Sequence, residues 1–121
     1  MNIEELYQYC MNKKGVTEHF PFDKDTLVFK VGNKMFCLTS LKDFEAQNAS
    51  VNLKSTPEDA IELREKYAGI IAGYHMNKTH WNTVAIGKDV PDDVVFMLID
   101  NSYHLIFNSL PKKVKEEICT T

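Results

Sequence analysis

One short polar segment contains the densest group of side chains that could take part in chemistry or binding. It runs from His75 to Asn82 and includes two histidines, two asparagines, a lysine, a threonine and a tryptophan. A histidine can act as a general base or as a metal ligand. Hydrogen-bond donors, one cation and a large aromatic ring can also contact the phosphates and bases of a nucleic acid.

The two histidines of this segment do not predict a metal site. His75 and His80 are five residues apart, and no carboxylate or cysteine stands with them at a ligand spacing. Hydrogen bonds that orient the loop account for both residues more simply. The other histidines, His19 and His104, stand alone in the sequence. We therefore expect no bound metal and no other cofactor.

No pattern in the sequence indicates a catalytic reaction. The motifs of phosphate-binding loops, serine hydrolases and zinc peptidases are absent. Ser102 lies next to Tyr103 in a helical pattern with no evident base, and Cys37 lies in a strand pattern, where a cysteine is usually a small core residue. We expect that the protein is not an enzyme.

Three lysines on predicted strands could stand beside the polar segment. Lys30 and Lys34 flank a Gly-Asn turn, and Lys54 ends another strand pattern. Solvation of strand ends would explain them, and so would a β wing that is pressed against phosphates. The predicted nucleic-acid-binding residues are these lysines together with the polar segment: Lys30, Lys34, Lys54, His75, Asn77, Lys78, His80 and Asn82.

Composition is ordinary for a globular protein, and the charge limits the partners. The chain has 121 residues, of which 44% are hydrophobic, and 14 Lys and Arg against 17 Asp and Glu leave a net charge of −3. This length suits a single domain spanning residues 1–121. An acidic chain is not held to DNA or anionic lipid by bulk charge alone, but a local basic face is still possible.

The cysteines and the apolar runs predict a cytoplasmic protein with no membrane partner. Cys10, Cys37 and Cys119 form no paired motif, which favours reduced thiols over disulfides. The first residues have neither the basic start nor the apolar run of a signal peptide. The longest strongly apolar run, Val94 to Ile99, is too short to span a bilayer.

Periodicity and turn residues predict the elements that must position these side chains. A helix should begin at Ile3 and end near Lys14, and the Gly32-Asn33 pair between two β-rich runs predicts a hairpin. Phe44 suggests a short strand within residues 43–50, and Phe20 and Phe22 are expected to plug the edge of the domain. The remaining predicted elements are a strand at Val51–Lys54, a helix capped by Thr56, a loop or short strand at Ile70–His75, a strand at Trp81–Ile86 and helical segments at Pro91–Leu110 and Lys112–Ile118.

This order predicts an α+β fold, a mostly antiparallel sheet with helices packed against it. The first helix and the Pro91–Leu110 segment each have an apolar stripe and no other partner in so short a chain. Both are therefore expected to pack on the sheet that contains the hairpin.

Several segments resemble the MmcQ/YjbR family. The most specific is His75-Met76-Asn77-Lys78 followed by His80-Trp81-Asn82, and it is supported in order by Phe20-Pro21-Phe22, Gly32 to Phe36, Val51 to Lys54 and Leu110-Pro111-Lys112-Lys113. Lys14-Gly15 departs from the common Pro-Gly, and Ala72 replaces a common proline. The resemblance implies a CyaY-like (frataxin-like) fold and DNA binding of the double-wing type. The iron-binding acidic helix of frataxins is not carried over, because the first helix offers only Glu4 and Glu5.

Three functional hypotheses follow. The first is a DNA-binding module that uses the hairpin lysines and the His75–Asn82 segment, which requires these residues to share one face. The second is a small-ligand pocket built from His75, Asn77, His80 and Asn82, which requires a concave site. The third is a protein-interaction adaptor, which requires a dominant apolar surface patch.

Overall fold

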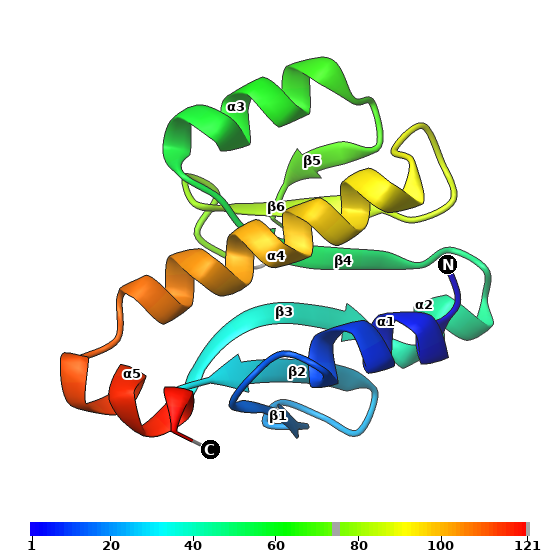
Figure 1. The fold of residues 1–121 in the computed structure, drawn as a ribbon. Helices are drawn as coiled ribbons and strands as arrows, with labels where there is room; N and C mark the ends of the chain where they lie inside the picture. Colours follow the sequence, from blue (N-terminus) through cyan, green and yellow to red (C-terminus); the bar gives the residue numbers. More distant parts are fainter. Residues whose placement is uncertain (74–75, 121) are drawn as a thin grey trace.

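A six-stranded antiparallel sheet organises the residues that the computed structural model describes, which are 1–73 and 76–120. The strands occur in the spatial order β1-β2-β3-β4-β6-β5, and every neighbouring pair is antiparallel. Figure 1 shows the sheet behind the helices. The strands are β1 Val16–His19, β2 Thr26–Val31, β3 Lys34–Ser40, β4 Ser50–Lys54, β5 Ile70–Ala72 and β6 Trp81–Ala85.

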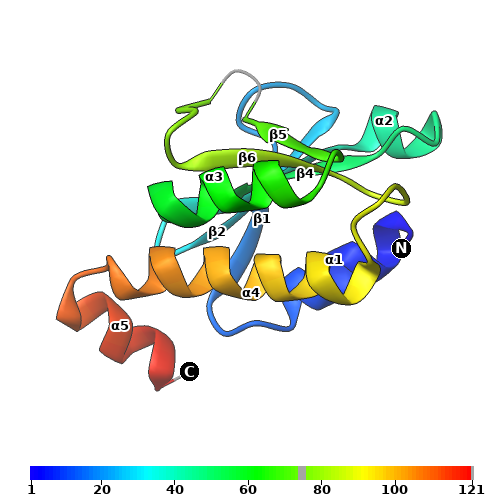
Figure 2. The same cartoon turned by 90° about the horizontal axis from the view of Figure 1, so that it is seen from above.

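The helices cover one face of this sheet. The long helix α4 crosses it with α1 alongside, α3 packs near β5 and β6, and the view from above shows all three on the same side (Figure 2). Their bounds, with those of the short α2 and the last helix α5, are α1 Ile3–Met11, α2 Leu41–Glu45, α3 Pro57–Lys66, α4 Asp92–Asn108 and α5 Lys112–Cys119. The α+β class and the packing of the first helix and the 91–110 segment on the hairpin sheet are confirmed.

The main core lies between the sheet and the helices α1 and α4. Leu6 and Cys10, one helical turn apart on α1, are fully buried against it, and Phe29 and Phe36 fill it from the sheet. Tyr103 of α4 meets Phe36 edge to face, with ring centroids 5.4 Å apart. Burial of each such large side chain stabilises the fold by roughly 1.5–3 kcal/mol.

The hairpin between β2 and β3 turns through two residues with positive φ. Gly32 has φ 56° and Asn33 has φ 66°, the left-handed pair that a two-residue hairpin turn requires. A Cβ atom on Gly32 would come within 2.5 Å of a methyl group of Leu110. A side chain at position 32 would therefore have to displace Leu110 and adopt a strained positive φ, and the turn lies against the connection between α4 and α5.

β3 contains one extra residue next to this turn. Phe29 of β2 pairs with Cys37, but the next residue, Lys30, pairs with Met35. Phe36 is thus a β-bulge, and such a bulge leaves a backbone group without its ladder partner. The carbonyl oxygen of Phe36 must find another donor.

A serine on α4 supplies that donor. The Ser102 hydroxyl donates to the Phe36 carbonyl oxygen at 2.6 Å and accepts from the Lys54 amide at 2.9 Å. Phe36 and Lys54 would be the next pair of the β3–β4 ladder after Cys37 and Leu53. Ser102, which is fully buried, therefore substitutes for a missing sheet hydrogen bond and explains why a polar residue stands on the buried face of α4.

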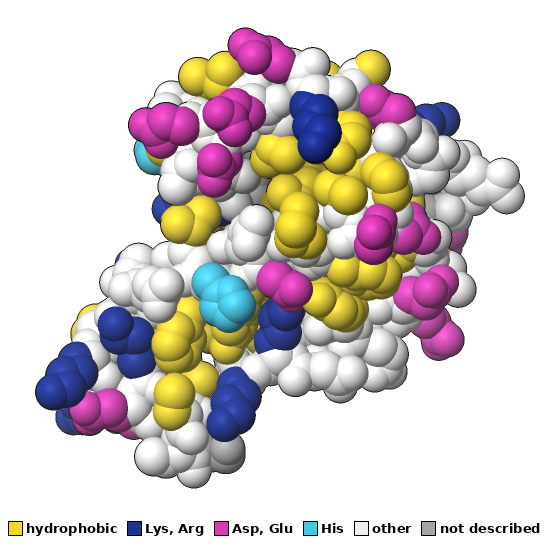
Figure 3. Space-filling model, turned by 45° about the horizontal axis from the view of Figure 1, so that its top comes forward, with side chains coloured by type: hydrophobic (Ala, Val, Ile, Leu, Met, Phe, Trp, Pro, Cys, Tyr) yellow, Lys and Arg dark blue, Asp and Glu magenta, His cyan; other side chains and the backbone are white. Residues whose placement is uncertain are grey.

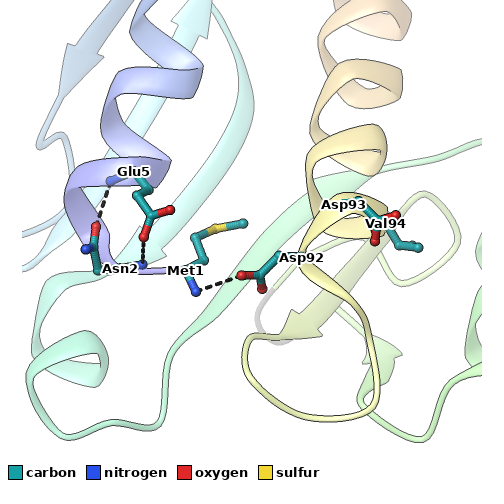
Figure 4. A network of polar contacts seen from close by, with 6 residues as sticks. All are labelled: Met1, Asn2, Glu5, Asp92, Asp93 and Val94. Atoms are coloured by element: carbon teal, nitrogen blue, oxygen red, sulfur yellow. Dashed lines mark hydrogen bonds and ion pairs between the residues drawn. The ribbon is translucent and has the colours of Figure 1, made fainter.

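The helices α1 and α4 begin side by side and are joined there (Figure 4). Asn2 and Glu5 form a reciprocal capping box, with side chain to backbone distances of 2.8 and 3.1 Å. The Met1 ammonium donates to Asp92, in the first turn of α4, at 2.9 Å. This hydrogen bond raises the pKa of the terminal amino group above its ordinary value.

A second tie joins the helices further along. The Tyr9 hydroxyl donates to both carboxylate oxygens of Asp100 at 2.8 Å, and the Lys13 ammonium pairs with the same carboxylate. Burial opposes ionisation of Asp100, but the Lys13 and Tyr9 hydrogen bonds together outweigh it and lower its pKa. Burial and the bond to Asp100 raise the pKa of Tyr9 to about 12.

The first helix ends one turn before its predicted limit. α1 stops at Met11, and the chain turns at Gly15, which has φ 75°. It then forms β1, a strand that the sequence analysis did not identify. β1 is an edge strand in which only Val16 is buried, so the alternating apolar pattern that predicts a strand is absent.

Two expectations about the connections are wrong. Phe44 lies in the helix α2 rather than in a strand, because the Ser40 side chain caps the helix by accepting from the Asp43 amide at 3.2 Å. Phe20 and Phe22 are 45% and 64% exposed, so they do not plug the edge of the domain. Each lines a surface cavity instead of entering the core.

We predict that Ser102→Ala lowers the free energy of unfolding by about 1–3 kcal/mol, because two buried backbone groups lose their partner. Urea unfolding followed by circular dichroism measures this change. Asn101→Ala, at an exposed neighbouring position on α4, is the matched control and should change stability little. A loss in Ser102→Ala no larger than in the control would contradict the bridging role.

We predict that Asp100→Asn lowers stability at neutral pH by about 1 kcal/mol, a value reduced by the partial exposure of the carboxylate. A carboxyl group with a lowered folded pKa stabilises the fold above its unfolded pKa of roughly 3.9, and this contribution disappears as pH falls through the folded pKa. Urea unfolding of both proteins as a function of pH should therefore show curves that converge in acid. Glu65→Gln, at an exposed site on α3, should show no such convergence, and parallel Asp100→Asn and parent curves would refute the assignment.

Candidate nucleic-acid interface

The sheet face opposite α1 and α4 has a row of two lysines. Lys30 pairs with Met35, and Lys54 pairs with Trp81. These four residues lie on the four neighbouring strands β2, β3, β4 and β6. Because alternate residues of a strand share a face, the row points away from the main core, which contains Phe29 and its neighbours.

A small second core lies beside this row. Val28, Leu38 and Trp81 are buried together, and Met35 and Met76 pack against them. Trp81 is only 9% exposed, so it is a core residue, as the simpler interpretation of the sequence predicts. Trp81 thus anchors the start of β6 in this small core, against which the two methionines pack.

A cavity of about 490 Å³ opens on the same face. Two connections, residues 20–25 and the chain that follows residue 76, lie on this side of the sheet, away from the helices (Figure 2). Phe22 and Met76 line the cavity from these connections, and Met35 and Leu38 line it from β3. Its polar residues are Thr26, Thr39, Ser40, Asp43, Ser50, Asn52 and Thr83.

The antiparallel topology separates charges between the two ends of the sheet. The Gly32-Asn33 turn, the end of β4 and the start of β6 lie at one end, and α5 joins them there because Leu110 contacts Gly32 and Ile118 contacts Gly15. The lysines near this end are Lys13, Lys14, Lys30, Lys34, Lys54, Lys78, Lys112, Lys113 and Lys115.

The opposite end of the sheet is acidic. Its acidic residues lie at the starts of α1, β2 and α4 and in the connections between strands: Glu4, Glu5, Asp23, Asp25, Asp43, Glu45, Asp89, Asp92 and Asp93. Figure 3 shows the helix side, with acidic side chains over α3 and lysines around α5. Acids on α3 and α5 also lie near the basic end, so the excess of positive charge is local.

The structure brings some predicted site residues together and separates others. Lys30 and Lys54 share the open face, and Lys34, Asn77 and Lys78 are exposed on the turn and loop near the same end. His80 is half-buried in the turn immediately before β6. His75 lies outside the described residues.

Asn82 does not belong to a surface site. Its side chain is 1% exposed, its amide donates to the Ala60 carbonyl oxygen at 3.2 Å, and its oxygen accepts from Arg64 at 3.3 Å. It pairs with Leu53 on the helix-covered side of the sheet. Its prediction as a contact residue is corrected to a structural role that fixes α3 to β6.

Five lysines of the basic end were not among the predicted site residues, and two of them lie beside the hairpin turn on the last helix. Lys112 and Lys113 begin α5 and are exposed. The sequence shows them as a charged last helix, but only the contact of Leu110 with Gly32 places that helix next to the hairpin turn. In the sequence, the Leu110-Pro111 pair predicts that the long helix ends and the chain changes direction. It does not predict which part of the fold the next helix packs against.

Other site classes find no support among the described residues. Residues 1–73 and 76–120 contain no group of three or more His, Cys, Asp or Glu side chains that could hold a metal ion. No helix in this part of the chain has the length and apolar character needed to cross a membrane.

Residues 11–105 match the family model YjbR. The chain belongs to the YjbR family. YjbR of Escherichia coli K12 is 35% identical over 116 residues, which are 96% of each chain, and YbdF of Escherichia coli O157:H7 is 34% identical over 82% of this chain and 79% of that protein. The family resemblance that the sequence motifs indicate is therefore confirmed.

Solved structures of similar proteins have the same fold. The Deinococcus radiodurans protein DR2400, whose crystal structure contains the domain DUF419, superposes with a TM-score of 0.89 at 34% identity, covering 98% of this chain and 88% of that one. A Pseudomonas syringae protein gives a TM-score of 0.74 at 29% identity over 88% of this chain and 99% of that one. The names of these YjbR-like proteins state no activity and no ligand, so the comparisons establish family and fold.

Proposed function

We propose that this YjbR-family protein binds DNA in the double-wing manner, through the open sheet face and the β2–β3 hairpin turn, and catalyses no reaction. The observation behind the proposal is the lysine row, Lys30 and Lys54, on the one sheet face that α1 and α4 leave uncovered. Lys34 and Lys78 extend the row at the turn and at the loop before β6.

The spacing of the row suits a phosphate backbone. β2 and β4 are separated by one strand, so Lys30 and Lys54 start about 10 Å apart at the backbone. Their flexible side chains can close on neighbouring phosphates of one strand from that separation. Lysine acts there as a point charge, which positions a protein on DNA without selecting a base sequence.

The charge asymmetry of the molecule supports an oriented approach. With a net charge of −3, the protein as a whole is repelled by DNA, but the basic end is attracted and the acidic end is turned away. A dipolar charge distribution of this kind steers encounter more than it adds affinity. We therefore expect modest affinity for DNA and a shallow salt dependence, because only a few lysines contact phosphates.

The hypothesis of a pocket around His75, Asn77, His80 and Asn82 loses support, because Asn82 is buried and bonded to α3. An adaptor role has one favourable observation. Met97 is 51% exposed beside a groove of about 470 Å³ between α3 and α4, which Leu63 and Leu105 also line. An adaptor is therefore the second candidate function.

We predict that Lys34→Glu combined with Lys78→Glu weakens DNA binding by about tenfold or more at low salt, while the circular dichroism spectrum stays unchanged. Four lysine–phosphate contacts give a plot of log affinity against log salt with a slope of roughly −3 to −4, and the double variant should flatten it by about 2. Fluorescence anisotropy with a labelled DNA in a salt series measures both quantities.

The matched control is Lys42→Glu combined with Lys88→Glu. It changes the net charge by the same amount, but these exposed lysines lie at the acidic end of the sheet. Equal losses in the two double variants would indicate bulk charge instead of a defined face. Absence of binding by the parent protein at low salt would reject the DNA-binding function and leave the adaptor role.

A further inference from the structure

We propose that the cavity on the open sheet face binds one unpaired nucleobase of the DNA strand whose phosphates the lysine row holds. The inference rests on the proposed DNA binding and adds to it a preference for single-stranded or locally opened DNA.

The walls of the cavity suit a flat aromatic ring. Phe22 is 64% exposed at the cavity although it is among the largest apolar side chains of the protein. Met35, Leu38 and Met76 form the other apolar surface. Stacking on an aromatic side chain and contact with thioether groups both stabilise a planar ring, and a bound base would cover the exposed Phe22.

The polar groups of the cavity suit the edge of a base better than a phosphate. The Asn52 side-chain oxygen accepts from the Thr83 hydroxyl at 2.5 Å, and no hydrogen bond between its amide group and another described residue is present. Asp43 lines the same cavity with a carboxylate, and none of the described residues that line it is a lysine or an arginine. A carboxylate repels a phosphate but accepts hydrogen bonds from a base.

This donor and acceptor pair also suggests which bases fit. Asn52 can donate to a ring nitrogen or carbonyl oxygen, and Asp43 can accept from an exocyclic amino group. Adenine and cytosine present an acceptor next to an amino group, whereas thymine has no amino group. The cavity should therefore favour amino-bearing bases over thymine.

The lysine row is placed to hold the phosphate of the same nucleotide. Asn52 lines the cavity, and Val28 is buried in the small core with Leu38, which also lines it. Lys30 and Lys54 follow Val28 and Asn52 by two residues on the same strands and the same face. Two residues along a strand span about 6.6 Å, which is comparable to the separation between the phosphate and the base of one nucleotide. A phosphate at the row thus leaves its base over the cavity.

Base pairing blocks this arrangement. In a duplex the base edge is hydrogen-bonded to its partner and both base faces are stacked, so a pocket can take the base only after it leaves the helix. The cavity should accordingly distinguish single-stranded from double-stranded DNA, whereas the lysine row alone should not.

Phe22→Ala tests the cavity, and Phe20→Ala is its matched control. Both phenylalanines are exposed and belong to the same connection, but Phe20 lines a different cavity, beside α1. Anisotropy titrations at fixed low salt compare labelled oligo-deoxycytidine and oligo-deoxythymidine with a duplex hairpin. We expect the parent to bind oligo-deoxycytidine most tightly, and Phe22→Ala to lose about fivefold or more on that strand alone, while Phe20→Ala behaves as the parent.

The outcomes separate this inference from the proposed function. Equal binding of single strand and duplex by the parent, with Phe22→Ala unchanged, would overturn the base site and leave DNA binding intact. Equal losses on both DNA forms in Phe22→Ala would also overturn it, because they indicate a general effect of the connection.

A second measurement does not depend on DNA binding. NMR spectra of protein with labelled methionine methyl groups are recorded with adenosine and, separately, with ribose 5-phosphate. We expect adenosine to shift the signals of Met35 and Met76, in the parent and not in Phe22→Ala, even if oligonucleotides do not bind. Shifts caused by ribose 5-phosphate but not by adenosine would overturn the inference in favour of an anion site, and the absence of shifts with adenosine would also overturn it.

Discussion

The hydroxyl group of Ser102 makes the contact on which the geometry of the open face depends. It bonds at once to the Phe36 carbonyl oxygen and to the Lys54 amide, and so it joins α4 to two strands where their own ladder is interrupted. Without this bridge the bulge in β3 would leave two buried polar groups unsatisfied, which is costly inside a protein. The bulge also turns Met35 onto the uncovered face, where it pairs with Lys30, so the surface beside the lysine row depends on a residue on the far side of the sheet.

The two faces of the sheet are buried to very different extents. Helices α1 and α4 bury one side in a large core, and the other side retains only the small cluster around Trp81. An antiparallel sheet tolerates such asymmetry because one face can meet water. Here that face is neither purely polar nor closed by a helix of the described residues. Apolar groups stay accessible at the cavity, beside cations, which is the combination that a nucleotide requires.

The same topology separates the charges of an acidic protein. Each turn brings distant segments to one end of the sheet, and the contacts of Gly32 with Leu110 and of Gly15 with Ile118 add the last helix to the basic end. A protein with a net charge of −3 thereby gains a local basic surface. Because screening limits electrostatic reach to about 10 Å, local arrangement matters more for a phosphate contact than the total charge does.

The sequence alone determined the features that depend on neighbouring residues. The Gly32-Asn33 turn, the apolar stripe of α4 and the cap at Thr56 are local signals, and each corresponds to an observed element. The motif from His75 to Asn82 was sufficient to indicate the YjbR family. Burial of Trp81 was also predictable, since a lone large aromatic in a strand pattern usually packs.

Only the tertiary structure decided which side of the sheet each residue occupies. Trp81 and Asn82 are adjacent, yet one lies on the open side and the other under α3, because β6 pairs Lys54 with Trp81 and Leu53 with Asn82. A shift of one residue in that register would exchange the two faces, and nothing in the local sequence sets it. The edge strand β1 and the place of Lys112 and Lys113 beside the hairpin likewise depend on partners distant in the chain, since backbone pairing and packing between remote segments determine them.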